Sequence, residues 1–243
     1  MFQYAAGLAL AHRRNTVLKL DVSWFSEGSA EASHERYGLD CFLLDAHFAT
    51  EQELAWCRGH QRNVAESRFG RLLAKIGLRR YAELLPTGGN WHNQKQFHFD
   101  TEFFDLPDGT VIDGTFQSEK FFAPVAKIIR KQFAFRYAPS AKVAEIANEI
   151  QSSEAVAVHF RRGDLVSNPR YQNTQSPLGF EYYSRAFEEI RARVSSPKYF
   201  IFSDEIIYAK ESGICPDGAI FVDCVEDWNS YDALHLMTLC KHF

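Results

Sequence analysis

The segment from Ala155 to Phe160, with the sequence AVAVHF, constrains the fold of this 243-residue chain more than any other. It is short, rich in β-branched residues and almost wholly apolar, which is typical of a strand buried on both faces of a parallel sheet. Parallel strands are joined by crossover connections, so helices must cover both faces of such a sheet. The segment therefore predicts an α/β fold.

The rest of the C-terminal half alternates between helical and extended patterns, as that fold requires. Helices are expected at 182–193, near 206–211 and at about 231–241, and strands at 199–202 and 219–222. This order predicts a Rossmann-like half whose ligand lies at the carboxyl ends of the strands. We place the boundary between two domains so that residues 1–145 form the first and residues 146–243 the second.

The N-terminal half also alternates. Small residues predict a helix over 2–14, an extended run follows at 16–20, and further helices are expected at 121–133 and 141–150. Thr50 and Glu53 form a capping box that opens another helix. Residues 62–80 combine an apolar helical face with arginines and lysines, which we interpret as a solvated helix. The alternative is that this basic helix contacts the acceptor or a membrane surface.

Charge and cysteine content limit the partners and the compartment. The formal net charge of −4 provides no positive field for nucleic acid, so any anion site must be local. The five cysteines are scattered and lack the close pairing of a zinc or redox site, which indicates reduced thiols. The apolar start has no basic leader. Together these features favour a cytoplasmic location.

Four polar residues lie near the end of the buried strand or directly after it: His159, Arg161, Arg162 and Asp164. They lie at the edge where open α/β sheets bind ligands. Adjacent guanidinium groups offer planar donor forks to phosphate oxygens, and Gly163 lets the backbone approach a ligand closely. The other interpretation is a solvated loop held by an Arg–Asp ion pair.

A second polar pair, Ser203 and Asp204, follows the next strand. Either residue could cap the helix that comes after it. A carboxylate at this edge could also accept hydrogen bonds from the ribose or the base amine of a nucleotide. The two roles are compatible.

The sequence lacks the motifs of several common enzyme classes. It contains no Asp-x-Asp pair, the usual mark of a metal-bridged sugar nucleotide, so we expect no metal and expect arginine to neutralise the leaving group instead. It also lacks the P-loop, the G-x-G-x-x-G and the G-x-S-x-G patterns. Kinase, dehydrogenase and hydrolase functions are therefore disfavoured.

Five separated segments occur in an order that points to one family. They are MFQYA at 1–5, GTFQSEKFF at 114–122, HFRRGD at 159–164, FSD at 202–204, and LM followed by CKH at 236–242. Together they resemble the α-1,2-fucosyltransferases, glycosyltransferase family 11. Compared with that family both ends of the chain look cut.

The resemblance implies a GT-B-like architecture, with two Rossmann-like halves, a cleft between them and an incomplete C-terminal half. The first domain would be the acceptor side, and the second would bind GDP-fucose. It implies inverting, metal-independent transfer of fucose, without a cofactor, to a hydroxyl of a glycan acceptor, expected to be O2 of a terminal galactose. In a bacterium, O-antigen assembly and peripheral contact with the inner membrane would follow by analogy.

The resemblance also implies roles for the site residues. Arg161 is expected to contact the diphosphate, and Arg162 to assist it or to hold the loop. Asp204, with Ser203, is expected at the nucleoside. Asp164 and His159 are both candidates for the base, and we favour Asp164 because His159 closes a strand and could be held in the core.

Two other functions fit parts of the pattern. The first is a catalytically silent module that binds a nucleotide or phosphosugar. The second is another arginine-based transferase, such as a sulfotransferase. The acceptor sugar and the oligomeric state have no signal in the sequence, because acceptor specificity is expected in loops such as 167–179.

Overall fold

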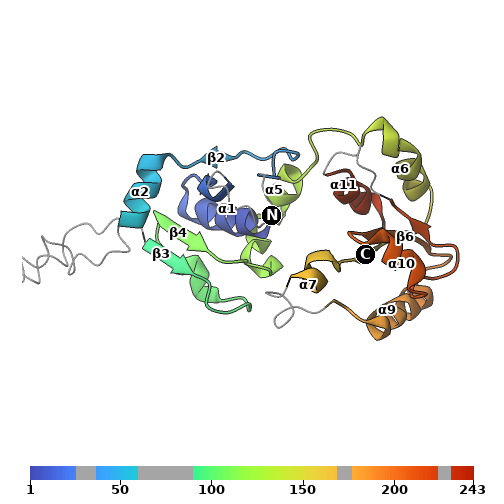
Figure 1. The fold of residues 1–243 in the computed structure, drawn as a ribbon. Helices are drawn as coiled ribbons and strands as arrows, with labels where there is room; N and C mark the ends of the chain where they lie inside the picture. The colour runs from blue at the N-terminus through green and yellow to red at the C-terminus, as the bar shows by residue number, and fades with distance from the viewer. Residues whose placement is uncertain (26–36, 60–89, 169–176, 224–230) are drawn as a thin grey trace, which may run out of the picture. The chain divides into compact units, whose positions relative to one another are not determined.

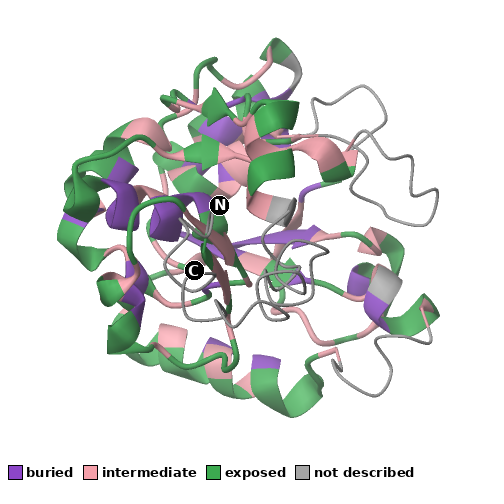
Figure 2. Ribbon diagram, turned by 90° about the vertical axis from the view of Figure 1, so that its left-hand side faces the viewer, coloured by how far each residue is buried: buried purple, intermediate pink, exposed green. Residues whose placement is uncertain are grey.

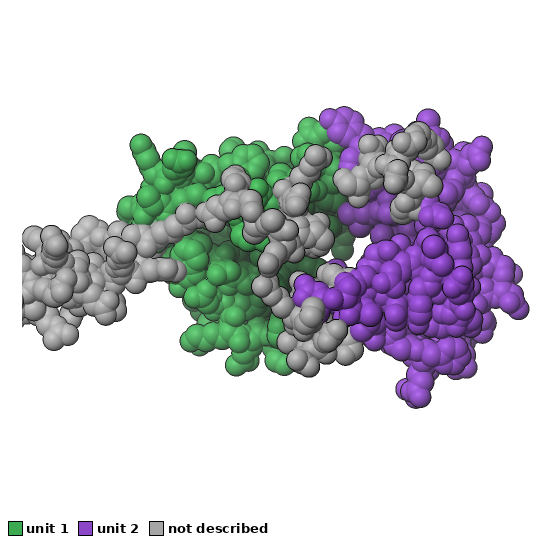
Figure 3. Space-filling view, viewed as in Figure 1, with its two compact units in different colours: residues 1–136 green, residues 137–243 purple. Residues whose placement is uncertain are grey.

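The computed structural model describes residues 1–25, 37–59, 90–168, 177–223 and 231–243. They form two compact units, Met1–Arg136 and Tyr137–Phe243, coloured separately in Figure 3. The expected domain boundary at 145/146 falls inside helix α6 (Ala144–Gln151), whose buried side chains belong to the core of unit 2. The predicted basic helix at 62–80, most of the loop at 167–179, and Cys224 lie outside the described residues.

Unit 2 is an α/β unit, as the sequence predicts (Figure 1). After the short 3-10 helix η6 (Ala141–Val143) and α6, the elements are β5 (Ala155–Phe160), α7 (Gly163–Ser167), α9 (Phe180–Arg193), β6 (Lys198–Ser203), α10 (Ile206–Glu211), β7 (Ile220–Phe221) and α11 (Asp232–Leu239). The three strands are parallel and lie in the order β5-β6-β7. Helices and strands thus alternate along the chain as expected.

Alternate residues of the strands face two separate cores. Figure 2 colours the buried residues of the chain purple. Ala157 and Phe200 pack with residues of α6 and α11 on one face of the sheet. Val156 and Ile201 pack with residues of α9 and α10 on the other face. Burial on both faces explains why the sequence of β5 is almost continuously apolar.

The last residues of the chain lie along the free edge of β5. The amides of Lys241 and His242 donate to the carbonyl of Ala155, at 3.0 and 3.1 Å, and the amide of Ala157 donates to the carbonyl of His242 at 2.9 Å. This makes a parallel bridge between Val156 and His242. As a result β5 is an interior strand, paired on both sides.

Unit 1 contains two small parallel sheets and a phenylalanine-rich core. Its elements are α1 (Phe2–Arg14), β1 (Lys19–Leu20), η1 (Ser23–Phe25), β2 (His47–Phe48), α2 (Glu51–Gly59), β3 (Asn90–Asn93), η3 (Thr101–Asp105), β4 (Thr110–Asp113), η4 (Glu119–Phe121), η5 (Ala123–Val125) and α5 (Ala126–Gln132). Strand β1 pairs with β2, and β3 with β4. The core places Phe103, Phe116 and Phe121 against Ala6 and Leu10 of α1.

Local signals were correct at some helix starts and wrong at others. The capping box at the start of α2 is confirmed, because Thr50 N donates to Glu53 Oε2 at 2.9 Å and Glu53 N donates to Thr50 Oγ1 at 3.3 Å. The helix expected from Phe121 instead begins with two 3-10 turns and becomes α-helical only at Ala126. Pro124 has no N–H donor, which disfavours α-helical hydrogen bonds there. No helix in the described ranges is long and apolar enough to cross a bilayer.

Candidate functional site

The two polar clusters found in the sequence lie side by side at one edge of the sheet in unit 2. Strands β5 and β6 are parallel, and their register places Phe160 beside Ser203. The loop that follows β5, residues 161–164, therefore lies next to the loop that follows β6, residues 203–205. We call these the RRGD loop and the SDE loop.

Ser203 joins the ends of the two strands. Its hydroxyl donates to the carbonyl of Phe160 at 2.8 Å and accepts a hydrogen bond from the amide of Glu205 at 2.9 Å. A serine hydroxyl has one proton to donate, and here that proton is used within the protein. Ser203 thus fixes the geometry of both loops.

Asp204 binds the backbone of the RRGD loop. Its Oδ1 accepts a hydrogen bond from the amide of Arg162 at 2.9 Å. A Cβ atom added to Gly163 would lie 2.9 Å from Asp204 Oδ2 and 3.3 Å from its Cγ. Glycine is therefore needed at position 163 because the carboxylate of Asp204 occupies the space of a side chain.

The side chain of Arg162 is held by the SDE loop and by α10. Its Nε donates to Glu205 Oε2 at 3.1 Å, and its guanidinium carbon lies 3.7 Å from the centre of the Tyr208 ring. Only 26% of the Arg162 side chain is exposed. The ion pair and the cation–π contact together orient this guanidinium group.

His159 and Arg161 both present their side chains at the surface. His159 is exposed, so the expectation that it could be held in the core is wrong. Strand alternation puts it on the same face as Ala155 and Ala157, but it lies near the carboxyl end of the strand, where its side chain is exposed. Nearby protein atoms still remove part of its hydration, which lowers the pKa of His159 below its usual value. The carboxylate of Asp204 opposes this shift, and the charge of Arg161 adds to it.

Asp164 is the last residue of the RRGD loop and its backbone lies in α7, while its side chain is outside the described part of the structure. The structure thus brings His159, Arg161, Arg162, Ser203 and Asp204 together at one edge. Within the described ranges, no group of three or more His, Cys, Asp or Glu side chains is placed to hold a metal ion.

Two residues of this edge, Glu205 and Tyr208, were missed by the sequence analysis. Both contact Arg162, yet neither belongs to a motif that draws attention on its own. Their spacing of three residues at the start of α10 was the available signal, because residues at that spacing share a helix face.

Two other segments named in the sequence analysis, 1–5 and 114–122, meet in unit 1. Gln3 Nε2 of α1 donates to the carbonyl of Gly114 at 2.8 Å. The side-chain carbonyl of Gln94 accepts hydrogen bonds from the amides of Thr115 and Phe116, both at 2.9 Å. These contacts hold Phe116 at a φ of 49°, an unusual conformation for a residue other than glycine.

Comparison with known proteins decides the family. The model of Glycosyl transferase family 11 matches residues 94–243, more than half of the chain and the whole of the edge described above. The chain belongs to glycosyl transferase family 11. Members of this family are glycosyltransferases, so a nucleotide-sugar donor and a glycan acceptor are its substrates.

Two relatives from Escherichia coli show how distant the similarity is. An alpha-1,2-colitosyltransferase is 25% identical over 213 residues, which cover 87% of this chain and 67% of the relative. The O-antigen biosynthesis glycosyltransferase WbnK is 24% identical over 262 residues, which cover 100% of this chain and 81% of the relative. No solved structure matches the chain.

Proposed function

We propose that this family 11 glycosyltransferase moves fucose from GDP-fucose to O2 of a terminal galactose on a glycan acceptor, with inversion and without a metal. The observation that carries the proposal is the joining of the RRGD and SDE loops at the carboxyl ends of β5 and β6. This is the edge where open α/β sheets bind nucleotides. The name of one relative, an alpha-1,2-colitosyltransferase, supports the α-1,2 linkage.

In this proposal Arg161 binds the diphosphate of the donor. The guanidinium of Arg162 is already oriented by Glu205 and Tyr208, which suits it to hold the loop while Arg161 binds the ligand. The diphosphate gains negative charge as it departs. Preorganised guanidinium donors stabilise that charge in the role that a metal ion plays elsewhere.

In the same proposal Asp204 accepts hydrogen bonds from the nucleoside. One of its oxygens binds the amide of Arg162, and a carboxylate has further lone pairs to offer. Ser203 is different, because its proton is used by the carbonyl of Phe160. We therefore assign Ser203 a positioning role and Asp204 the direct contact.

Transfer requires a base at the acceptor hydroxyl. The hydroxyl oxygen attacks the anomeric carbon of fucose, the bond from that carbon to the phosphate oxygen breaks, and GDP leaves with the electron pair. His159 and Asp164 both remain candidates for taking the proton. The exposure of His159 and its lowered pKa favour the imidazole, which is then mostly neutral at pH 7.

The deciding experiment is a transfer assay with GDP-fucose and a panel of terminal galactosides, run with EDTA present. We expect activity with EDTA, and a loss of about 100- to 1,000-fold in kcat/KM for Arg161→Ala. Arg161→Lys should lose less of its kcat/KM, since lysine keeps the positive charge but lacks the planar pair of guanidinium donors. Arg193→Ala, on the last turn of α9, is the control and should retain activity. Near-normal transfer by Arg161→Ala would refute the assignment.

A colitose donor is the second candidate, because one relative bears that name. The same assay with a nucleotide-linked colitose in place of GDP-fucose discriminates between them by kcat/KM. GDP binding without transfer of either sugar would instead favour the catalytically silent module. Competition by adenosine bisphosphates, and not by GDP, would favour a sulfotransferase.

The GT-B-like architecture, the cytoplasmic location and the peripheral contact with the inner membrane belong to the same proposal. Unit 2, with parallel strands covered on both faces by helices, has the composition of a Rossmann-like half. A crystal structure of the chain with GDP would test the architecture. Fractionation of cells producing the protein would test the location.

A further inference from the structure

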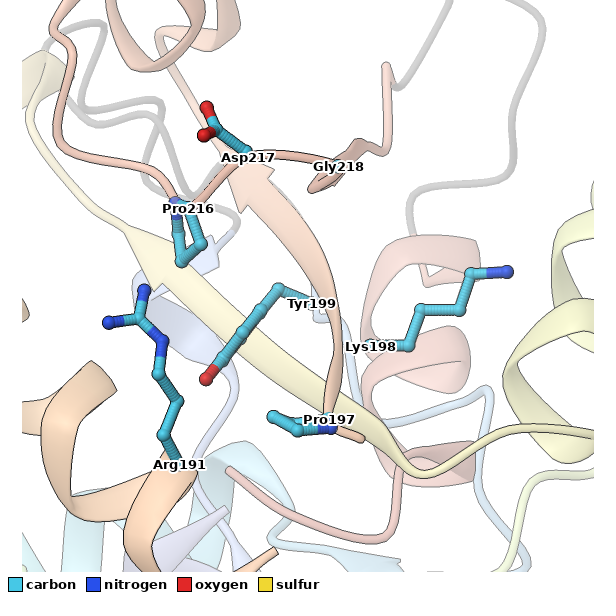
Figure 4. A pocket seen from close by; sticks show the side chains of 7 residues that line it. All are labelled: Arg191, Pro197, Lys198, Tyr199, Pro216, Asp217 and Gly218. Atoms are coloured by element: carbon cyan, nitrogen blue, oxygen red, sulfur yellow. The ribbon is translucent and has the colours of Figure 1, made fainter. Parts of the chain in front are cut away.

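A pocket opens at the edge of the unit 2 sheet opposite to the RRGD and SDE loops (Figure 4). Its volume is about 380 Å³, within the range of small-molecule sites. Arg191 of α9 forms one wall, residues 197–199 at the start of β6 form the floor, and residues 216–218 before β7 form the other wall. All of these residues belong to unit 2, so the pocket is complete within that unit.

Tyr199 is the unexpected component of this pocket. Its residue is only 5% exposed, and within the described residues no group accepts the proton of its buried hydroxyl. Burial raises the pKa of this hydroxyl, while the charge of Arg191 and a hydrogen bond with its guanidinium oppose the shift. Buried polar groups are nearly always satisfied, so a hydroxyl proton without an acceptor beside a cavity points to a missing partner.

The missing partner must be an acceptor. A guanidinium group has no lone pair, so Arg191 cannot accept the proton of the Tyr199 hydroxyl in any rotamer. Figure 4 shows both polar ends on the same side of β6. Lys198 does not compete for a ligand there, because its amine is bonded to Glu149 Oε1 at 2.6 Å. Two donors at one position, one of them charged, favour an anionic oxygen that accepts a hydrogen bond from both.

The other wall limits what can bind. Asp217 is exposed and belongs to a turn closed by a hydrogen bond from the amide of Ala219 to the carbonyl of Pro216, at 3.1 Å. Its carboxylate can accept hydrogen bonds from the hydroxyl groups of a ligand. Pro197 and Pro216 give the pocket rigid apolar surfaces.

We propose that this pocket binds a carboxylate or phosphate group carried on a hydroxylated body, such as an acidic sugar or a sugar phosphate. Tyr199 and Arg191 donate to the anionic oxygens, and Asp217 accepts from a hydroxyl of the ligand. The exposed side chain of Arg191 is the movable part of the wall and gives the ligand access to the covered hydroxyl. The site is separate from the proposed donor site and does not depend on the identity of the donor.

An NMR titration of the full chain tests the site. The probes are D-glucuronate and D-glucose 6-phosphate, with D-glucose as the neutral control, and the signals are the amides of Gly218 and Ala219 and the Nε–H of Arg191. We expect saturable shifts with at least one anionic sugar and none with glucose. The tighter of the two anions identifies the group as carboxylate or phosphate. Equal shifts with glucose, or no shifts with either anion, would overturn the proposal.

Matched variants assign the binding to this pocket. Arg191→Gln should weaken binding of the anionic sugar at least 10-fold, and Tyr199→Phe about 3- to 10-fold. Arg193→Gln is the control, because Arg193 lies on the same turn but pairs with Glu189 outside the pocket, and it should bind like the unmodified chain. An equal loss with Arg193→Gln would mean nonspecific attraction to positive charge and would refute the site.

The melting temperature of Tyr199→Phe provides an independent measurement. A hydroxyl proton without an acceptor adds little to folding, so the substitution should change the melting temperature of the ligand-free protein little. Adding the anionic sugar should raise the melting temperature of the unmodified protein more than that of the variant. An equal rise in both proteins would show that the hydroxyl does not contact the sugar, and the inference would fail.

Discussion

Gly163 shows how closely the two loops of the donor edge are packed. Alanine at this position would place its Cβ 2.9 Å from Asp204 Oδ2, so the carboxylate and the loop it binds would have to move. For Gly163→Ala we expect the KM for the donor to rise about 10- to 100-fold, because small displacements of binding groups cost this much. Steady-state kinetics with GDP-fucose measure the effect.

Gly179 is the matched control for this substitution. A Cβ added there would meet nothing within 4 Å, and its φ of −88° is open to any residue. Gly179→Ala should change the KM for the donor less than about 2-fold. If both alanine variants behaved alike, close packing at Gly163 would not be the cause.

His159 gives the activity a predictable dependence on pH. A base must be neutral to take a proton, and a pKa lowered from 6.5 keeps the imidazole neutral to lower pH. With His159 as the base, kcat/KM should be level between pH 7 and 8 and should fall as the pH drops through a pKa below 6.5. His159→Gln should lower kcat about 100- to 10,000-fold and abolish this inflection. An unchanged pH profile in that variant would assign the proton to another group, with Asp164 the next candidate.

At the scale of elements, a buried carboxylate ties α11 to the chain before η6. Asp232 is 0% exposed, and its Oδ2 accepts a hydrogen bond from the hydroxyl of Ser140 at 2.9 Å. Asp232→Ala should lower the free energy of unfolding by about 2 kcal/mol, the scale of a hydrogen bond to a charged group. Urea unfolding measures this. In a Ser140→Ala background the same substitution should cost less, whereas equal costs would show that the two residues do not act as a pair.

Several elements of both units were predictable because their signals are local. The nearly continuous apolar sequences of β5 and β6 follow from burial on both faces, and the capping box of α2 in unit 1 is a pattern of four residues. The contacts of Arg162 with Glu205 and Tyr208 were not predictable in this way, because they depend on the register between β5 and β6. Register and side-chain direction are set by the packing of the whole sheet. For this reason the sequence identified residues at this edge. It did not distinguish the residues proposed to contact the ligand from those that hold them in position.

At the scale of the whole molecule, burial makes the thiols unreactive. The described cysteines, Cys41, Cys57, Cys215 and Cys240, are all free. Burial raises the pKa of each of these thiols, and raises it to about 11 for Cys215 and Cys240. The sequence analysis expected reduced thiols of this kind.

Alkylation tests this property of the folded chain. Since the thiolate is the nucleophile, iodoacetamide at pH 7.5 should modify Cys215 and Cys240 about 100-fold more slowly in the native protein than in the unfolded one. Mass spectrometry of peptides gives the rate for each cysteine. Rapid native labelling of either residue would show that unit 2 opens locally far more readily than its packed core suggests.

The shared hydrogen bonds of the RRGD and SDE loops have a consequence for how the enzyme can change over evolution. The amide of Arg162 donates a hydrogen bond to Asp204, and its side chain donates one to Glu205, so both bonds join the two loops. A substitution in one loop therefore changes the effect on function of a substitution in the other. Such epistasis favours paired substitutions over single ones. A designer who wishes to alter the nucleotide preference would therefore do better to exchange residues 161–164 and 203–208 together, as a cassette taken from one homologue.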